Sequence, residues 1–166
     1  MLKVVRGDQG QYWTDDTIRI LSPTNDLVTD CNSSGSYNNC SYVVKISYGG
    51  RSVILPGDAE EASWKSMMDA LGADVLACDI LKAAHHGRKS GYYQPAVEAM
   101  DPQVVICSVG KKPGTDASAD YARVADSVLS TRFCGTIRVT MWSDGEIWVE
   151  NHKGERQVTL PVLKAA

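Results

Sequence analysis

Apolar and polar residues alternate on either side of a glycine pair near the first third of the chain. The alternation covers residues 42–48 and residues 51–55, and Gly49 and Gly50 lie between them. Because side chains of a strand point alternately to its two faces, this pattern predicts a β-hairpin with a tight glycine turn. Earlier apolar stretches at 2–5 and 17–21 predict two further strands.

The polar run over residues 22–39 contains many Ser, Asn and Asp residues, which predicts a long surface loop. After the hairpin, apolar residues recur with the period of a helix over residues 59–71. Acidic residues begin this segment and Gly72 ends it. Strands are then expected at 79–83 and 104–108, with helices at 92–100 and 119–129. Three closing strands are expected at 135–141, 146–150 and 157–160. This order predicts an α/β fold, in one layered domain over residues 1–166.

Composition supports a soluble domain and restricts its partners. The chain has 166 residues, of which 43% are hydrophobic and 22% charged, and a net charge of -3. This charge excludes a global basic field, so that nucleic acid would have to be held by a local patch. Apolar runs are too short for a membrane span, and residues 1–10 lack the apolar core of a signal peptide, which together predict a cytoplasmic protein.

The five cysteines are odd in number and form no Cys-x-x-Cys pair. Cys78, Cys107 and Cys134 lie in apolar runs and are expected to be buried thiols. Cys31 and Cys40 bracket a polar segment and could form a disulfide in an oxidising compartment. In the cytosol they would stay reduced.

Two short segments at predicted strand ends carry residues suited to metal chemistry. The first ends in Asp58, and the second contains His85 and His86 before a glycine. A carboxylate can bridge two divalent ions, and imidazole nitrogens are good ligands for them. Alternatively, Asp58 could be the N-cap of the following helix, and the histidines could bond a backbone carbonyl. His152 lies in a turn-like stretch and is expected on the surface.

Several segments occur in the order found in a known group of enzymes. They are residues 39–46, 52–55, 57–60 with Gly-Asp-Ala-Glu, 79–82, 85–87 with His-His-Gly, Pro102, and 108–110 with Ser-Val-Gly. Together they resemble the second half of metallo-β-lactamase-fold hydrolases of the competence-protein type. These ComEC-like enzymes are similar to the soluble domain of the bacterial DNA-uptake channel.

The resemblance implies the C-terminal half of an αββα sandwich, a mixed sheet with flanking helices. It further implies two Zn²⁺ or Mn²⁺ ions bridged by Asp58, with either His85 or His86 as a ligand of the second ion. The family's upstream motif, His-x-His-x-Asp-His or His-x-Asp-x-Asp-His, is absent. An N-terminal half or a second subunit would then have to complete the site, unless catalysis has been lost. Exposed sheet edges would favour such association or oligomerisation.

A second departure concerns the segment after Ser108-Val109-Gly110. Many relatives carry Gly-His-Pro there, whereas this chain has residues 114–118, and Asp116 could occupy the histidine's place. Asp116 could act as a catalytic acid only if its pKa were raised.

Three hypotheses of function follow. The first is a metal-dependent hydrolase that acts on a phosphodiester or a nucleic-acid-like substrate. Candidate substrate-binding residues are Asn39, Ser41, Lys82 and Lys111, with Arg88, Lys89 and Lys112 nearby in sequence. Asn39 and Ser41 could equally close their loop through backbone bonds, and the basic residues could be a solvated rim. The second hypothesis is a non-catalytic interaction or regulatory module. The third is an unrelated α/β binding domain in which Asp58 only caps a helix.

Overall fold

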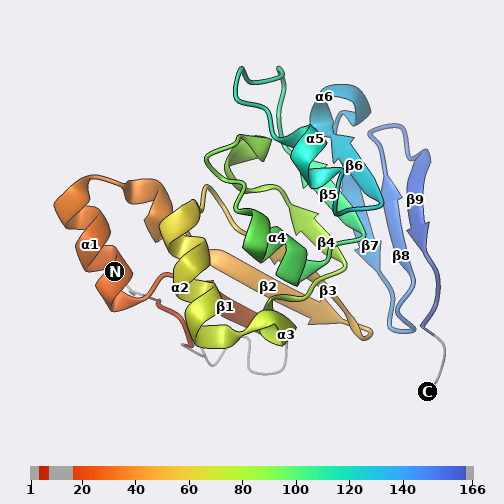
Figure 1. Cartoon of the computed structure of the whole chain (residues 1–166). Helices are drawn as coiled ribbons and strands as arrows, with labels where there is room; N and C mark the ends of the chain where they lie inside the picture. Colours follow the sequence, from red (N-terminus) through yellow and green to blue (C-terminus); the bar gives the residue numbers. More distant parts are fainter. Residues whose placement is uncertain (1–3, 8–16, 164–166) are drawn as a thin grey trace.

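A six-stranded mixed sheet runs through the molecule in the order β1-β2-β3-β4-β5-β6 (Figure 1). The computed structural model describes residues 4–7 and 17–163. The first three strands are antiparallel neighbours, and β3 to β6 are parallel. The strands are β1 (Ile18–Ser22), β2 (Val43–Tyr48), β3 (Arg51–Leu55), β4 (Ile80–Lys82), β5 (Val104–Cys107) and β6 (Ser127–Ser130). The predicted α/β class and the hairpin of β2 and β3 are confirmed.

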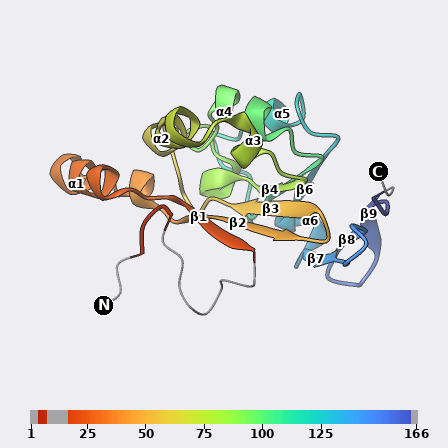
Figure 2. The same ribbon diagram turned by 90° about the horizontal axis from the view of Figure 1, so that it is seen from below.

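The helices that connect the parallel strands lie on one face of this sheet (Figure 2). Parallel strands are joined by right-handed crossovers, and here each new strand is added on the same side of the previous one. The crossover segments therefore all pass over the same face. They contain α2 (Glu61–Leu71), α3 (Ala73–Leu76), the short turn η2 (Ala84–Gly87), α4 (Gln94–Met100) and α5 (Ser118–Tyr121).

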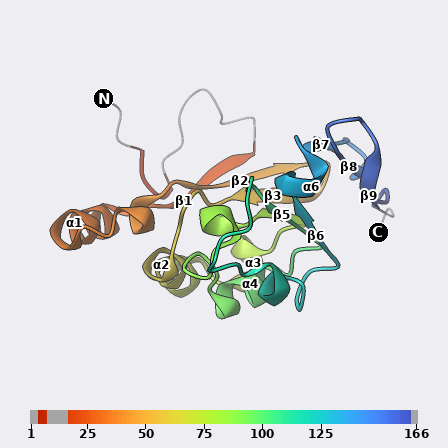
Figure 3. The ribbon, with the colours of Figure 1, turned by 90° about the horizontal axis from the view of Figure 1, so that it is seen from above.

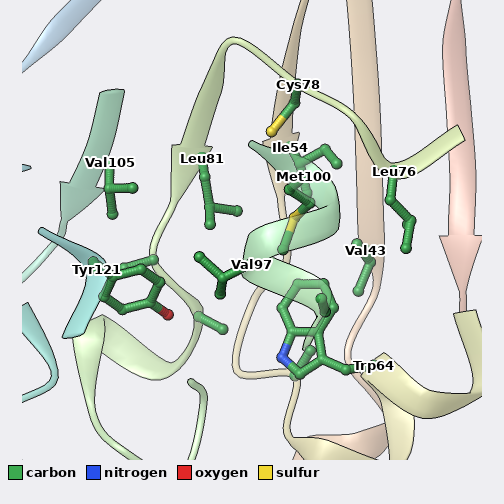
Figure 4. Packing of buried hydrophobic residues seen from close by; sticks show 14 of the residues in the cluster. Val43, Ile54, Trp64, Leu76, Cys78, Leu81, Val97, Met100, Val105 and Tyr121 are labelled. Atoms are coloured by element: carbon green, nitrogen blue, oxygen red, sulfur yellow. The ribbon is translucent and has the colours of Figure 1, made fainter. Parts of the chain in front are cut away.

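The main hydrophobic core fills the space between these helices and the sheet (Figure 4). The sheet contributes Ile54, Leu81 and Val105, and helix α2 contributes Trp64 and Met67. The Trp64 side chain is only 1% exposed, and its Nε1 donates a hydrogen bond to the carbonyl oxygen of Gly91 at 3.0 Å. This bond fastens the segment that follows the two histidines to the core.

A three-stranded sheet packs against the other face through a second apolar cluster. It consists of β7 (Arg138–Met141), β8 (Ile147–Glu150) and β9 (Arg156–Leu160) in antiparallel order. Ile147 and Leu160 meet Ile80 and Val104 of the large sheet there. Figure 3 shows this sheet and helix α1 (Asn25–Ser34) at opposite ends of the molecule.

Arg51 joins the two sheets. Its guanidinium forms an ion pair with Asp79 at 2.6 Å and donates to the carbonyl oxygens of Gly145 and Pro161 at 3.0 and 2.9 Å. On the same face of the hairpin, Tyr48, the cross-strand partner of Arg51, is 54% exposed, and Leu55 at the far end of β3 is 40% exposed. The small sheet therefore leaves apolar side chains of β2 and β3 exposed on the face that it packs against.

Two predicted elements are wrong, and both errors have a local cause. The predicted loop over residues 22–39 contains α1, whose N-cap Thr24 accepts a bond from the Leu27 amide, and the short helix η1 (Tyr37–Cys40). The predicted helix over residues 119–129 ends as α5 at Tyr121, and its second half contains the edge strand β6. Short apolar runs such as 127–130 fit a strand as well as a helix.

Most of the remaining predictions fall close to the observed elements. The helix expected at 59–71 begins at Glu61, and three closing strands are present as expected. Of the strand expected over residues 2–5, residues 2 and 3 lie outside the described residues, and Val4 and Val5 belong to no strand.

All five cysteines, including Cys31 and Cys40, are free thiols. Within the described ranges, the helices are all too short or too polar to cross a membrane.

Candidate functional site

Asp58 lies in the turn after β3, and it does not cap helix α2. The helix begins at Glu61, and its N-cap residue is Glu60, whose side chain makes no capping bond. The backbone amide of Asp58 donates to Ser41 Oγ at 3.1 Å, while its carboxylate is 41% exposed. The interpretation of Asp58 as a helix cap is therefore wrong, and its carboxylate is available for another role.

The two histidines lie in a tight turn with unusual backbone angles. His85, His86 and Gly87 have φ values of 45°, 59° and 80°. Residues other than glycine rarely adopt such angles, and strain of this kind persists where the surroundings hold it, often at functional sites. Here the His85 amide donates to the Gly57 carbonyl, and the Gly87 carbonyl accepts from the Ala117 amide. A Cβ atom at Gly87 would lie 2.8 Å from Cys107 Sγ, so that only glycine fits.

His86 directs one ring nitrogen toward Asp58. Its Nδ1 lies 2.8 Å from the Ser108 carbonyl oxygen, which can only accept, so that Nδ1 carries the proton. In the neutral ring, the lone pair is then on Nε2, which lies 3.7 Å from Asp58 Oδ1. A ligand nitrogen oriented by a bond to its other nitrogen is the usual arrangement of a metal-binding histidine.

His85 is oriented by a carboxylate. Its Nδ1 lies 3.0 Å from Glu60 Oε1 and 3.0 Å from Ser90 Oγ, and its side chain is 17% exposed. The ring meets that of His86 edge to face, with centroids 6.3 Å apart. The Nε2 atom of His85 has no hydrogen-bond partner among the described residues. Both histidines are therefore held through Nδ1, and only His86 directs Nε2 toward Asp58.

Glu60 is the centre of a hydrogen-bond network behind His85. Burial raises the pKa of its carboxyl, but bonds from Asn38, Ser90 and His85 outweigh this, and the pKa lies below its usual value. A carboxyl whose pKa is lowered by folding stabilises the native state fully above its unfolded pKa of about 4.3. That contribution is lost as the pH falls through the lower folded pKa.

We therefore expect Glu60→Gln to destabilise the protein by about 1.5–3 kcal/mol near neutral pH, the usual contribution of hydrogen bonds to a charged group. Thermal unfolding of the two proteins between pH 3 and pH 7 would measure this. The difference in Tm should be largest above pH 5 and should shrink below pH 4. A difference that stays constant down to pH 3 would contradict the role of the ionised carboxylate.

The predicted substrate-binding residues divide into two groups. Lys82 Nζ donates to the Gly57 carbonyl at 3.3 Å, and burial lowers its pKa although the nearby charge of Asp58 raises it. Lys82 thus lies at the site. Asn39 Oδ1 accepts a bond from the Ser63 amide in the first turn of α2, and Ser41 holds the Asp58 amide. Asn39 and Ser41 therefore bond backbone groups, as the alternative interpretation proposed. Their partners, Ser63 and Asp58, lie far along the sequence rather than within the same loop.

Asp116 lies beside the histidine turn, because its backbone pairs with that of Arg88. Its Oδ2 accepts from Ser118 Oγ at 2.6 Å and lies 3.3 Å from Lys112 Nζ. Burial raises the pKa of the Asp116 carboxyl, but the bonds from Ser118 and Lys112 outweigh this effect, and the pKa lies below its usual value. A lowered pKa favours an ionised carboxylate rather than a proton donor. Arg88 and Lys89 are exposed beside it, and Lys111 and His152 are exposed as well, the latter as expected.

The geometry brings two potential metal ligands together. Asp58 Oδ1 and His86 Nε2 are a hard oxygen and a borderline nitrogen at a separation that one ion could span, which suits Zn²⁺ or Mn²⁺. Within residues 4–7 and 17–163, no group of three or more His, Cys, Asp or Glu side chains could hold an ion. Zinc sites commonly use at least three protein ligands. Any site here would need ligands beyond this group.

Two known proteins are similar to this chain in sequence. ComE operon protein 3 of Bacillus subtilis (strain 168) is 32% identical over 109 residues, which is 66% of this chain and 13% of that protein. Recombination protein 2 of Haemophilus influenzae is 30% identical over 138 residues, which is 80% of this chain and 16% of that protein. The chain is a distant homologue of both.

These homologues confirm the likeness to the ComEC-like competence proteins that the motifs indicate. The chain matches less than a fifth of the length of ComE operon protein 3 or of Recombination protein 2. No protein-family model matches the chain.

Sequence reasoning missed the residues that orient His85. Glu60 was interpreted only as a favourable charge in the first turn of a helix, and Asn38 and Ser90 were given no role. The role of Glu60 could have been predicted from its position two residues after Asp58, because both carboxylates then lie at the end of one strand. The Asn38 contact depends on the fold of η1 and had no such signal.

Proposed function

We propose that this chain is part of a metal-dependent hydrolase of the metallo-β-lactamase superfamily that acts on a phosphodiester. The observation that carries the proposal is the pair of Asp58 Oδ1 and His86 Nε2, 3.7 Å apart, with His86 Nδ1 fixed by the Ser108 carbonyl. The homology to ComE operon protein 3 supports the choice of this superfamily. The helix layer and mixed sheet are compatible with the C-terminal half of an αββα sandwich.

Asp58 and His86 would hold Zn²⁺ or Mn²⁺, with Asp58 as the bridge between two ions. Such ions supply an activated water and neutralise charge that develops on the phosphoryl oxygens. Between His85 and His86, we assign the ligand role to His86, because it faces Asp58. His85 would be a positioning residue, or a ligand of an ion held mainly by groups from elsewhere, through its free Nε2.

Basic groups around the pair would orient the substrate. The Lys82 ammonium group donates to the carbonyl of Gly57, the residue before Asp58, and would contact a phosphate oxygen there. Further phosphate groups of the substrate would contact three exposed basic residues, Lys111, Arg88 and Lys89. Asp116, held ionised by Lys112 and Ser118, would position Lys112 rather than donate a proton.

The missing ligands would come from an N-terminal half of the same protein or from a second subunit. Exposed apolar side chains at Tyr48 and Leu55 support this, because they stay exposed on a hairpin face that the three-stranded sheet covers only in part. The same face supports a second candidate, a non-catalytic interaction or regulatory module without metal. The two candidates differ in whether Asp58 and His86 bind an ion.

Calorimetric titration of the purified chain with Zn²⁺ and with Mn²⁺ would test the proposal. We expect binding that becomes at least tenfold weaker in Asp58→Ala and in His86→Ala. Asp69→Ala is the matched control, because this aspartate is exposed on α2, far along the helix from the pair, and it should bind like the parent chain. Equal binding in all four proteins would reject Asp58 and His86 as metal ligands and favour the interaction module.

A further inference from the structure

A surface cleft lies beside the candidate site, at the carboxyl ends of β5 and β6. Its volume is about 400 Å³. Val109 and Val128 give it apolar walls, Ser118 and Ser130 add hydroxyl groups, and Arg132 and Phe133 of the short helix α6 (Thr131–Cys134) border it. We refer to it as the Phe133 cleft.

Phe133 is the one phenylalanine of the chain, and it is not in the core. Its side chain is 78% exposed, the highest fraction among the large hydrophobic side chains of the described residues. The guanidinium carbon of Arg132 lies 5.0 Å from the centre of its ring. An exposed ring beside a guanidinium group is a platform on which a flat, electron-rich ligand can stack.

The charges at the cleft favour a ligand with a negative group next to this flat part. Lys112 and Arg132 are both exposed at the cleft, and its one carboxylate, Asp116, is already bonded by Ser118 and Lys112. Cys107 at the wall is a neutral thiol, because burial and the charge of Asp116 raise its pKa to about 11. The cleft thus offers an aromatic face, hydroxyl groups and a net positive charge.

The cleft lies on the same edge of the sheet as the candidate metal ligands. Asp58 follows β3, His86 follows β4, and the cleft residues follow β5 and β6, which are the next parallel strands in order. Figure 1 shows α5 and α6 beside the end of β6. Since neighbouring strands are about 4.8 Å apart, the cleft begins roughly 5–10 Å from His86 along this edge. Ser108, which orients His86, directly precedes Val109 of the cleft.

We propose that the Phe133 cleft binds a nucleobase of single-stranded nucleic acid, with the base on Phe133 and the adjoining phosphate at Arg132 and Lys112. The placement of this base next to a cleaved phosphodiester rests on the proposed function of Asp58 and His86. The binding itself does not require a metal ion. A strand fits better than a duplex, because its bases are free to stack on an exposed ring.

Fluorescence anisotropy with a fluorescein-labelled oligothymidylate at low salt would test this. We expect Phe133→Ala to weaken binding by about 5- to 150-fold, the range for loss of one stacked base, and Phe133→Trp to retain it. Arg132→Ala should weaken binding as well and reduce its dependence on salt. Tyr37→Ala removes another exposed ring, 65% exposed on η1, and should leave binding unchanged.

Absent binding, or equal binding by the parent, Phe133→Ala and Arg132→Ala, would overturn the proposal. So would a change of self-association in Phe133→Ala, measured by sedimentation, because Phe133 would then contact another copy of the chain. Metal titration of Asp58→Ala and His86→Ala tests the proposed function separately. Metal binding that does not depend on these two residues, together with Phe133-dependent binding of the oligothymidylate, would reject the metal site and keep the cleft.

Discussion

Replacement of Arg51 by Ala is expected to lower the free energy of unfolding by about 3–5 kcal/mol, the range for one broken partner of a buried ion pair. The Arg51 side chain is 9% exposed and that of Asp79 is 16% exposed, so the lost bond would leave a nearly buried carboxylate without its cation. The carbonyl oxygens of Gly145 and Pro161 would lose their donors at the same time. Urea denaturation followed by tryptophan fluorescence would measure the effect.

The matched control is Arg123→Ala. Arg123 forms an ion pair with Asp120 at 3.0 Å, but its side chain is 77% exposed, and such pairs contribute about 0–1 kcal/mol. A second comparison is Arg51→Met combined with Asp79→Leu, which removes both charges and should restore much of the stability. If Arg51→Ala were no more destabilising than Arg123→Ala, the arginine would not join the two sheets as described.

Trp64→Ala should destabilise the protein by about 3–5 kcal/mol, because it leaves a large cavity between α2 and the sheet. Trp64 is 1% exposed, and its Nε1 also holds the Gly91 carbonyl, one residue after Ser90. The variant should therefore loosen the segment that orients His85 as well as the core. Thermal and urea unfolding would measure the stability, and amide hydrogen exchange at residues 85–91 would report the local effect.

A finer comparison separates the two contributions of Trp64. Trp64→Phe keeps most of the apolar volume but leaves the Gly91 carbonyl without its donor, and we expect a loss of about 1–3 kcal/mol. Trp142→Ala is the control for removal of an indole, since Trp142 is 44% exposed and meets Trp148 edge to face, with ring centroids 5.4 Å apart. An equal loss in Trp64→Ala and Trp142→Ala would contradict the packing described.

Much of the fold could be predicted because its elements have strong local signals. The hairpin of β2 and β3 combines alternation with a glycine pair, and α2 has a clear apolar face. Helix α1 buries only Leu27 and Cys31 and is otherwise polar, so its sequence favours a loop. Strand β6 forms at the sheet edge through its pairing with β5, and an isolated window cannot show that contact.

The candidate site was predictable only in part, for a related reason. Asp58 and His86 follow neighbouring parallel strands, and the carboxyl ends of such strands meet at one edge. The sequence left open which histidine faces Asp58. That choice depends on the left-handed turn at His85 and His86 and on the carbonyl of Ser108, which comes from the next strand.

The order of the large sheet also determines how the protein can be made. Each strand from β2 to β6 pairs with the strand that precedes it in the chain, so the sheet can grow while the polypeptide emerges from the ribosome. The small sheet depends on more distant partners, since Arg51 bonds residues 94 and 110 positions away. Until β7–β9 are synthesised, Ile80 and Val104 face the solvent. A nascent chain would therefore carry an adhesive apolar surface, a target for chaperones, until residues 138–160 have been synthesised.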